Sequence, residues 1–470
     1  MGVNEPARGR RAAKFAGAGA LFLGLLGAAS LHGAEPAGLT FPDAARKMRT
    51  AHGALKAADA EIRTREEEVG AAKGFRLPRV DLSASYLALD RPIEMDLGPV
   101  NDVLHVISPK LNLANPVLVN QQTFQLTAGA SWTLLAGGKV SAANAAAAAR
   151  LEDARQLRRL AEEGLLTELV KRYFGLRLAL AARDVRLDVR RGVETHAGHA
   201  RRMEEEGVLS KAERLHSEVA LAEAARQLKG AEQDVAIARA GLANLLALEG
   251  AGAEMVPATP LFVVGEVPPL EQFTVAAMAQ NPNLGRLAAQ KSLAAAGLSA
   301  AKGAWLPGVT VFGMREMYTA DLTFIFPRWV VGAAATFPVF DGMTREHRIA
   351  AAKGQTDQVA ELDAQARRDV AILVEKSYRE LAKAREQYDA LGPALVLGNE
   401  SLRVRRRAFE EGLGTSLEVV DAELSLSRVR LERLRSALET DLALASLLEA
   451  SGQADRFEAM RASAREEIER

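Results

Sequence analysis

The sequence contains no cysteine, few aromatic residues and no excess of charge of either sign. Without cysteine, the 470-residue chain forms no disulfide, offers no thiol for catalysis or metal binding, and has no acceptor for a lipoprotein anchor. Its 60 basic and 60 acidic residues balance, which argues against an electrostatic binder of DNA or RNA. Aromatic residues make up only 5%, while alanine and leucine dominate, which favours long helices over a large mixed core.

Long apolar runs are also missing. The run Phe15–Ala29 follows four basic residues between positions 8 and 14, and it is shorter than the ~20 residues that span a bilayer. This pattern is typical of a signal peptide, with a signal anchor as the alternative. We therefore predict an exported protein with a signal peptide in residues 1–34, cleaved near residue 30 or 34. Any membrane contact of the mature chain would have to use strands.

A ten-residue motif occurs twice in the chain. AAKGFRLPRV at 71–80 and AAKGAWLPGV at 300–309 share seven residues and lie 229 positions apart. Further along, the spacing is 205, where WTLLAG ending at Gly137 corresponds to FPVFDG ending at Gly342, and two Glu-Glu-Gly turns correspond in the same way. We predict two structural repeats, because such spacing indicates a duplicated unit. Their expected bounds are 35–250 and 269–452, with a linker at 251–268 and a C-terminal tail at 453–470.

Each repeat contains two stretches in which apolar and polar residues alternate. The clearest covers residues 124–132, with Phe124 and Trp132 at its ends, and the others cover residues 80–86, 309–318 and 329–337. Period two predicts strands. About ten residues with aromatic ends is the length of a tilted transmembrane strand, although a soluble hairpin with one buried face would give a similar pattern.

The connections between the paired strands differ in length. The first, Asp90–Gln122, contains four prolines, and the second, Thr319–Arg328, is much shorter. The first repeat is longer by 24 residues between Pro78 and Gly137, and insertions are tolerated in exposed loops. A long and a short polar connection on one side resemble the outer loops of a membrane barrel. We therefore expect the longer one at the cell surface.

The segments flanking the strands have helical patterns. Gly138–Glu206 contains no proline and Gly342–Glu411 contains only Pro393, so each would form a helix of roughly 100 Å at 1.5 Å per residue. After glycine turns, the helical pattern continues through Ser210–Gly250 and Thr415–Ala450. A three- and four-residue step predicts a coiled-coil seam at Leu166, Leu169, Tyr173, Leu176 and Leu180. Each repeat is then a strand hairpin joined to a very long helical hairpin.

A single chain could not complete a membrane structure from these parts. Four strands cannot close a barrel, and open edges in lipid leave backbone groups unpaired. Two chains would supply eight strands, with an interior nearly filled by side chains, whereas three would supply twelve and leave a lumen. Closure therefore favours a ring of chains without fixing the number at three.

The order of these features, given twice, resembles the TolC-type outer-membrane efflux protein family over nearly the whole mature chain. The resemblance rests on the alanine-rich run into Leu-Pro, the FPVFDG motif at 337–342 and the Glu-Glu-Gly turns followed by Ser210 and Thr415. It implies a mainly α fold with transmembrane β: duplicated helical hairpins form an α-barrel tunnel, and four strands per chain join a shared trimeric β-barrel. It also implies an exit duct in the outer membrane for an inner-membrane transporter and its periplasmic adaptor.

No catalytic, cofactor or metal constellation stands out in the sequence. His196 and His199 stand three apart in a helical segment, but no carboxylate or thiol completes a ligand set, so we interpret them as solvated surface histidines. We predict no enzyme, no cofactor and no nucleic-acid partner. An alternative class is a periplasmic coiled-coil adaptor or structural protein, although an adaptor would need one hairpin rather than two.

The resemblance also assigns residues at the periplasmic tips. Gly207 and Gly412 would reverse the helical hairpins, since glycine permits positive φ, and with Ser210 and Thr415 they would form the gate and the adaptor contact. They could equally be simple helix stops. Glu418 and Asp421 match the paired acidic positions that ring the tunnel entrance in the family, where crowded carboxylates select cations. An ordinary solvated helix face is the alternative.

Glu213 matches an acidic position whose family partner is a basic residue of the second repeat. Here that partner position is Gly414. The familiar salt-bridge latch between the hairpins is therefore in doubt, and Lys211 or Arg214 is the expected substitute.

Overall fold

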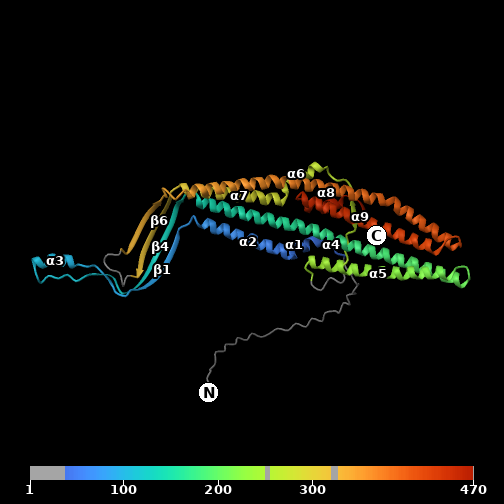
Figure 1. Cartoon of the computed structure of the whole chain (residues 1–470), viewed down its shortest axis with the longest axis horizontal. Helices are drawn as coiled ribbons and strands as arrows, with labels where there is room; N and C mark the ends of the chain where they lie inside the picture. Colours follow the sequence, from blue (N-terminus) through green and yellow to red (C-terminus); the bar gives the residue numbers. More distant parts are fainter. Residues whose placement is uncertain (1–37, 249–254, 319–326, 469–470) are drawn as a thin grey trace, which may run out of the picture. The chain divides into compact units, whose positions relative to one another are not determined.

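The computed structural model describes residues 38–248, 255–318 and 327–468. The predicted signal peptide and most of the connection after Tyr318 lie outside these residues. Within them, no helix combines the length and the apolar character that crossing a membrane requires. The principal helices and strands in chain order (Figure 1) are α1 (Phe41–Ala51), α2 (Gly53–Gly74), β1 (Arg79–Ala88), β2 (Ile93–Glu94), α3 (Gly98–Ile107), β3 (Val117–Val119), β4 (Gln122–Ala136), α4 (Lys139–Glu205), α5 (Lys211–Leu245), β5 (Leu261–Val264), α6 (Leu270–Gln280), α7 (Pro282–Lys302), β6 (Gly308–Tyr318), β7 (Trp329–Thr336), α8 (Thr344–Glu410), α9 (Ser416–Ala450), α10 (Phe457–Ala462) and β8 (Ala464–Ile468).

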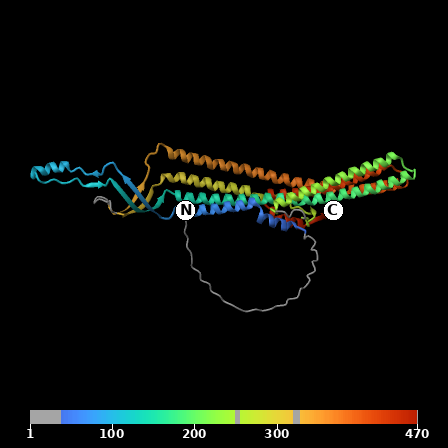
Figure 2. The same cartoon turned by 90° about the horizontal axis from the view of Figure 1, so that it is seen from below.

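Two long helical hairpins, α4–α5 and α8–α9, dominate the fold. Helices α4 and α8 have 67 residues each, and α5 and α9 have 35 each. In both cartoon views α4 runs beside α5 and α8 beside α9 (Figures 1 and 2). The two hairpins pack on each other mainly through α4 and α9. The expected mainly α fold of duplicated hairpins is confirmed.

The predicted seam along α4 lies in the main hydrophobic core. All five of its residues are buried, and they meet apolar residues of α5, α8 and α9 that include Leu242, Val374 and Leu444. Burial of a leucine side chain contributes about 1.5–3 kcal/mol. Packing of this seam, rather than helix propensity alone, therefore holds such long helices together.

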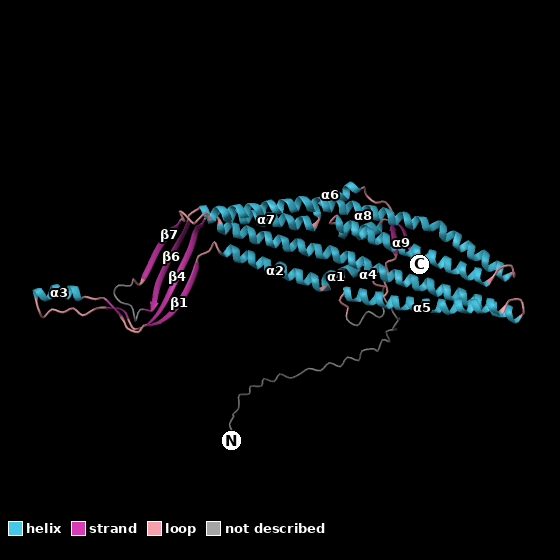
Figure 3. Ribbon diagram, in the orientation of Figure 1, coloured by secondary structure: helices cyan, strands magenta, loops and turns pink. Residues whose placement is uncertain are grey.

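Four strands form one antiparallel sheet in the order β1-β4-β6-β7 (Figure 3). All four coincide with the stretches of alternating residues. Strand β4 pairs with β1 with Ala130 opposite Val80, and with β6 with Ala136 opposite Gly308. The outer edges of β1 and β7 have no strand partner among the described residues.

A second, two-stranded sheet joins the predicted linker to the predicted tail. Strand β5 pairs antiparallel with β8, with Leu261 opposite Ile468. All four residues of β5 are buried in the main hydrophobic core, where Phe174 lies edge-on to Phe262 at 5.9 Å between ring centroids. The residues predicted as linker and tail thus contain core structure, while the repeat boundaries themselves stay a prediction.

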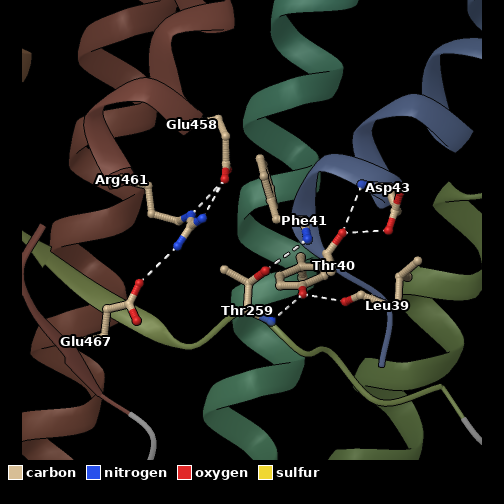
Figure 4. Close-up of polar contacts among 9 residues, drawn as sticks. Leu39, Thr40, Phe41, Asp43, Thr259, Glu458, Arg461 and Glu467 are labelled. Carbon is tan, nitrogen blue, oxygen red and sulfur yellow. Dashed lines mark hydrogen bonds and ion pairs between the residues drawn. The ribbon is translucent and has the colours of Figure 1, made fainter. Parts of the chain in front are cut away.

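Polar contacts fasten the start of the described chain, at Leu39 and Phe41, to this sheet region (Figure 4). The Phe41 backbone N–H donates to Thr259 Oγ1 at 3.0 Å. The Tyr173 hydroxyl donates to the Leu39 carbonyl at 2.6 Å and accepts from the Thr259 N–H at 2.9 Å. Because Phe41 of α1 also packs against the rings of Phe174 and Phe457, the first helix is tied to both α4 and the segment before β5.

The connection after β1 has more structure than the sequence indicated. Instead of a plain polar loop, it contains the β2–β3 ladder and helix α3, which has no buried residue. The Asn101 side chain fixes it by donating to the Leu113 carbonyl at 2.9 Å and accepting from the Leu113 N–H at 2.8 Å. Its prolines lie at the start of α3 and in the turns, where a missing N–H is tolerated.

Candidate functional site

The candidate site is the pair of tips where α4 turns into α5 and α8 turns into α9. Gly207 has φ +76° and Gly412 has φ +74°, a left-handed conformation that favours glycine. Each turn closes on a helix carbonyl, with the Val208 N–H bonded to Met203 at 2.8 Å and the Leu413 N–H bonded to Ala408 at 2.8 Å. The positions predicted to reverse the helices therefore do so.

Both returning helices begin with a side-chain cap. The Ser210 hydroxyl accepts from the Glu213 N–H at 3.3 Å. The Thr415 hydroxyl accepts from the Glu418 N–H, and the Glu418 carboxylate accepts from the Thr415 N–H, each at 3.3 Å. This reciprocal capping box satisfies two amides that a helix start leaves free. Ser210, Thr415 and Glu418 thus have local structural roles, whatever else they contact.

Glu213 links the two tips, but not as the sequence suggested. Its carboxylate accepts a hydrogen bond at 3.0 Å from the backbone N–H of Ser416, in the first turn of α9. A carboxylate at a helix N-terminus is favoured by the free N–H groups and the helix dipole. Arg214, the expected substitute, instead pairs with Glu204 at 2.5 Å and Glu218 at 2.7 Å in its own hairpin. Within this chain Arg214 therefore does not take the place of the missing basic residue, and a latch through Lys211 stays a prediction.

A buried histidine strengthens the same junction. His196 of α4 is only 7% exposed, its Nε2 lies 2.7 Å from the Ser416 hydroxyl, and its ring centroid lies 4.5 Å from that of Phe409. Burial, together with the smaller effect of the charges of His199, Arg406 and His216, lowers the pKa of His196 to about 4. The interpretation of His196 as a solvated surface residue is therefore wrong, because α8 and α9 cover it.

The acidic residues of the tip have different surroundings. Glu418 is half-buried and lies 2.7 Å from Arg405 of α8. Asp421 is exposed, and among the described residues no ion pair or side-chain hydrogen bond reaches it. Glu423, two residues on, is buried and pairs with Arg406 at 2.5 Å. Of these carboxylates, Asp421 has the least compensated charge.

We did not predict the Arg406–Glu423 pair from the sequence, although the first repeat contains a matching arginine and glutamate at the same spacing. Arg201 and Glu218 stand at the corresponding positions of the first repeat and pair at 2.8 Å. Both pairs are 17 residues apart across a tip. Gly192 makes room for the second pair, because a Cβ there would lie 2.9 Å from both the Arg406 and Glu423 side chains. No group of three or more histidine, aspartate or glutamate side chains in the described part is placed to hold a metal.

Two helical hairpins that end in capped glycine turns and continue from a four-stranded antiparallel sheet define the fold class of outer-membrane channels with a periplasmic helical tunnel. The chain belongs to the outer membrane efflux protein family, whose profile matches residues 46–248 and 274–453. It is thus an outer-membrane transport protein with its helices in the periplasm, and its family is one of efflux channels rather than enzymes.

Individual relatives agree with this family. The chain is 26% identical to Protein CyaE of Bordetella pertussis over 419 residues, which cover 86% of this chain and 82% of that protein. The outer membrane protein VceC of Vibrio cholerae superposes with a TM-score of 0.70 at 16% identity, covering 88% of this chain and 96% of VceC. The open-state MtrE outer membrane channel of Neisseria gonorrhoeae gives 0.70 at 19% identity, covering 88% and 89%.

Proposed function

We propose that three copies of this chain form a passive exit duct of a tripartite efflux or type I secretion system. The main support for the proposal is the four-stranded sheet joined to two long hairpins, because its edges at β1 and β7 have no partner strand in the described part of the chain. Unpaired backbone groups are costly in lipid, so the sheet needs neighbours. Twelve strands from three chains would leave a lumen, and the helices would extend that lumen into the periplasm.

The tips would meet a periplasmic adaptor that connects the duct to an inner-membrane transporter. Support comes from exposed apolar residues at the turns, where Val208 is 63% and Leu413 is 80% exposed. Exposed apolar side chains next to polar caps are typical of contact surfaces. Asp421, with Glu418 and Glu213, would line the entrance and favour cations.

The competing assignment, an adaptor or structural coiled coil, accounts for less of the chain. An adaptor would carry one helical hairpin between other domains, whereas this chain carries two hairpins and four long strands. Those strands leave apolar side chains outside, such as Val80 at 75% and Val331 at 69% exposure. A lipid-facing sheet accounts for this exposure, and a soluble coiled coil does not.

The test combines fractionation, mass and conductance. The mature protein should need detergent for extraction from outer membranes, run as a trimer after crosslinking, and open stable ion-conducting pores in planar bilayers. A monodisperse monomer in detergent-free buffer would contradict the proposal. If crosslinked trimers form but conduct no ions in any condition, the proposed duct function is contradicted and the proposed trimer is supported.

A further inference from the structure

One contact between the two repeats inside the chain is made through glycine alone. Gly137, in the turn from β4 to α4, lies against Gly303 at the end of α7, and a Cβ atom on either residue would overlap the carbonyl oxygen of the other. A Cβ on Gly137 would also lie 3.3 Å from the Cβ of Leu306. Directly beyond this contact, β4 and β6 begin to pair, with Ala136 opposite Gly308. The two glycines thus set how closely one repeat joins the next.

The corresponding glycines of the duplicated sequence face open space. Gly74 stands 229 residues before Gly303 in the repeated motif, and Gly342 stands 205 residues after Gly137. Around a Cβ built on either one, no other heavy atom of the described chain lies within 4 Å. Gly74 precedes β1 and Gly342 follows β7, so they lie at the two free edges of the sheet. Within the described part of one chain, no close neighbour therefore requires glycine at either position.

We propose that Gly342 of one protomer packs backbone to backbone on Gly74 of the next, as Gly137 packs on Gly303. The proposal rests on the ring of chains proposed above. It adds which residues form the joint between neighbouring protomers, namely Gly342 and Gly74, and in which register β7 pairs with β1. In that ring β7 neighbours β1 of the next copy, and the antiparallel alternation of β1, β4, β6 and β7 continues through the new pair. The occupant of this edge is therefore a second copy of the chain.

The duplicated sequence also fixes which residues face each other. Transferring the β4–β6 register by the two spacings places Asp341 opposite Arg79 of the next protomer, as Ala136 faces Gly308. It places Thr336 opposite Ser83, as Ser131 faces Phe312. Opposite charges at facing positions stabilise a strand pair.

The surfaces that the joint would cover are apolar and lie at the two edges. Val339 and Phe340, which follow β7, are 84% and 81% exposed, and Leu77, which precedes β1, is 68% exposed. Leu77 corresponds to Leu306, the side chain nearest Gly137. Contact between protomers at the glycine pair would bring these side chains together and remove them from solvent.

Replacing Gly74 with alanine distinguishes an effect on trimer assembly from an effect on folding of the single chain. The single chain has room for this methyl group, and alanine is a better helix former than glycine in α2. We expect Gly74→Ala to keep its helical circular dichroism but to lower the trimer fraction in mild detergent at least tenfold. Gly70→Ala, one turn earlier, is the matched control, because its counterpart Ser299 is exposed and no contact is expected there. Equal trimer fractions for the two variants would overturn the glycine contact.

A cysteine pair tests the register directly, since the native chain has no cysteine. Ser83→Cys combined with Thr336→Cys should give disulfide-linked oligomers on a non-reducing denaturing gel. Ser83→Cys with Ala335→Cys is the control, because successive strand residues point to opposite faces. An intact trimer without the first crosslink would overturn the register. A wild-type protein that forms no trimer would instead refute the ring itself, and lipid or detergent would then cover the edges.

Discussion

Glu418 and Asp421 are three residues apart on α9, but their charges are balanced differently. Glu418 caps its own helix and lies 2.7 Å from Arg405, so its field in the entrance would be largely cancelled. Asp421 has no such partner in the described structure, and only salt would screen it, over about 8–10 Å. Cation selectivity should therefore depend mainly on Asp421.

We predict that Asp421→Asn lowers the cation-to-anion permeability ratio severalfold, while Glu418→Gln changes it less and loosens the start of α9 instead. Reversal potentials under a KCl gradient in planar bilayers measure the ratio. Asp234→Asn, an exposed acid elsewhere on α5, is the control for loss of one negative charge. Equal losses from the Asp421 and Glu418 variants would show that Arg405 does not neutralise Glu418 in the assembled channel.

His196 should make the tip junction sensitive to acid. Its folded pKa, about 4, lies below the ordinary value of 6.5, so folding favours the neutral ring. The resulting stability is present above pH 6.5 and is lost as pH falls toward 4. The titratable and charged groups beside the ring are His199 on its own helix and Arg406 and Glu410 on α8, and the more distant His216 on α5 also acts on its charge.

We predict that amide exchange at the start of α9 becomes faster as the pH falls from 6.5 to 4 in the wild type. The rates are first corrected for the intrinsic pH dependence of exchange. His196→Gln should remove most of this extra dependence, because an amide does not titrate in this range. Hydrogen–deuterium exchange of peptides covering residues 409–420 measures the effect. His347→Gln, at an exposed position near the start of α8, is the matched control. The same acid response in both variants would assign the effect to another group.

The sequence could not place His196, because its neighbours Phe409 and Ser416 lie more than 200 positions away in the other repeat. Its local pattern is that of an exposed helix face. The seam at Leu166–Leu180 could be predicted because a period of three and four residues is a local property. The turns at Gly207 and Gly412 could likewise be predicted, because a glycine between two helical segments permits the left-handed conformation that ends a helix. Contacts between the hairpins lack a local signal.

The same distinction holds for elements. The four long strands follow from period-two alternation, which two faces of different polarity require. Strands β5 and β8 have four and five residues and pair across about 200 positions, so no periodicity revealed them. Helix α3 was hidden by the prolines around it, which indicated turns.

Helix α3 should lie outside the cell and be reachable there. It has no buried residue, and its connection joins β1 to β4 at the ends opposite the long helices. We predict that an epitope inserted after the exposed Lys110 labels on intact cells. Asn115 is a poorer position, because its side chain accepts from the Leu97 N–H at 2.9 Å.

The control for this experiment is an epitope inserted after the exposed Gly207, in a periplasmic tip, which should label only after permeabilisation. Protein level and trimer fraction should be unchanged for the Lys110 insertion. If the two insertions exchange their labelling behaviour, the orientation of the strands in the membrane is reversed.

The β5–β8 sheet joins the ends of both repeats to the common core. Deleting residues 464–470 would remove β8 and the buried Ile468, leaving the edge of β5 unpaired. Lost burial and hydrogen bonds together cost on the order of 2–4 kcal/mol. We predict that the midpoint of thermal unfolding falls by several degrees. Circular dichroism at 222 nm, recorded during heating, measures this midpoint. Ile468→Ala should give a smaller fall, and an unchanged midpoint for the deletion would show that the sheet does not stabilise the core.

The pairing of β5 with β8 also sets an order of events during biogenesis. Strand β5 leaves the ribosome and crosses the inner membrane about 200 residues ahead of its partner, so its apolar segment must wait until almost the entire chain has been delivered. Closing so distant a pair is slow, and the interval is a window in which periplasmic chaperones or proteases can reach β5. Completion of this sheet would therefore mark a fully delivered chain, and a prematurely ended chain would keep an unpaired apolar strand at its centre.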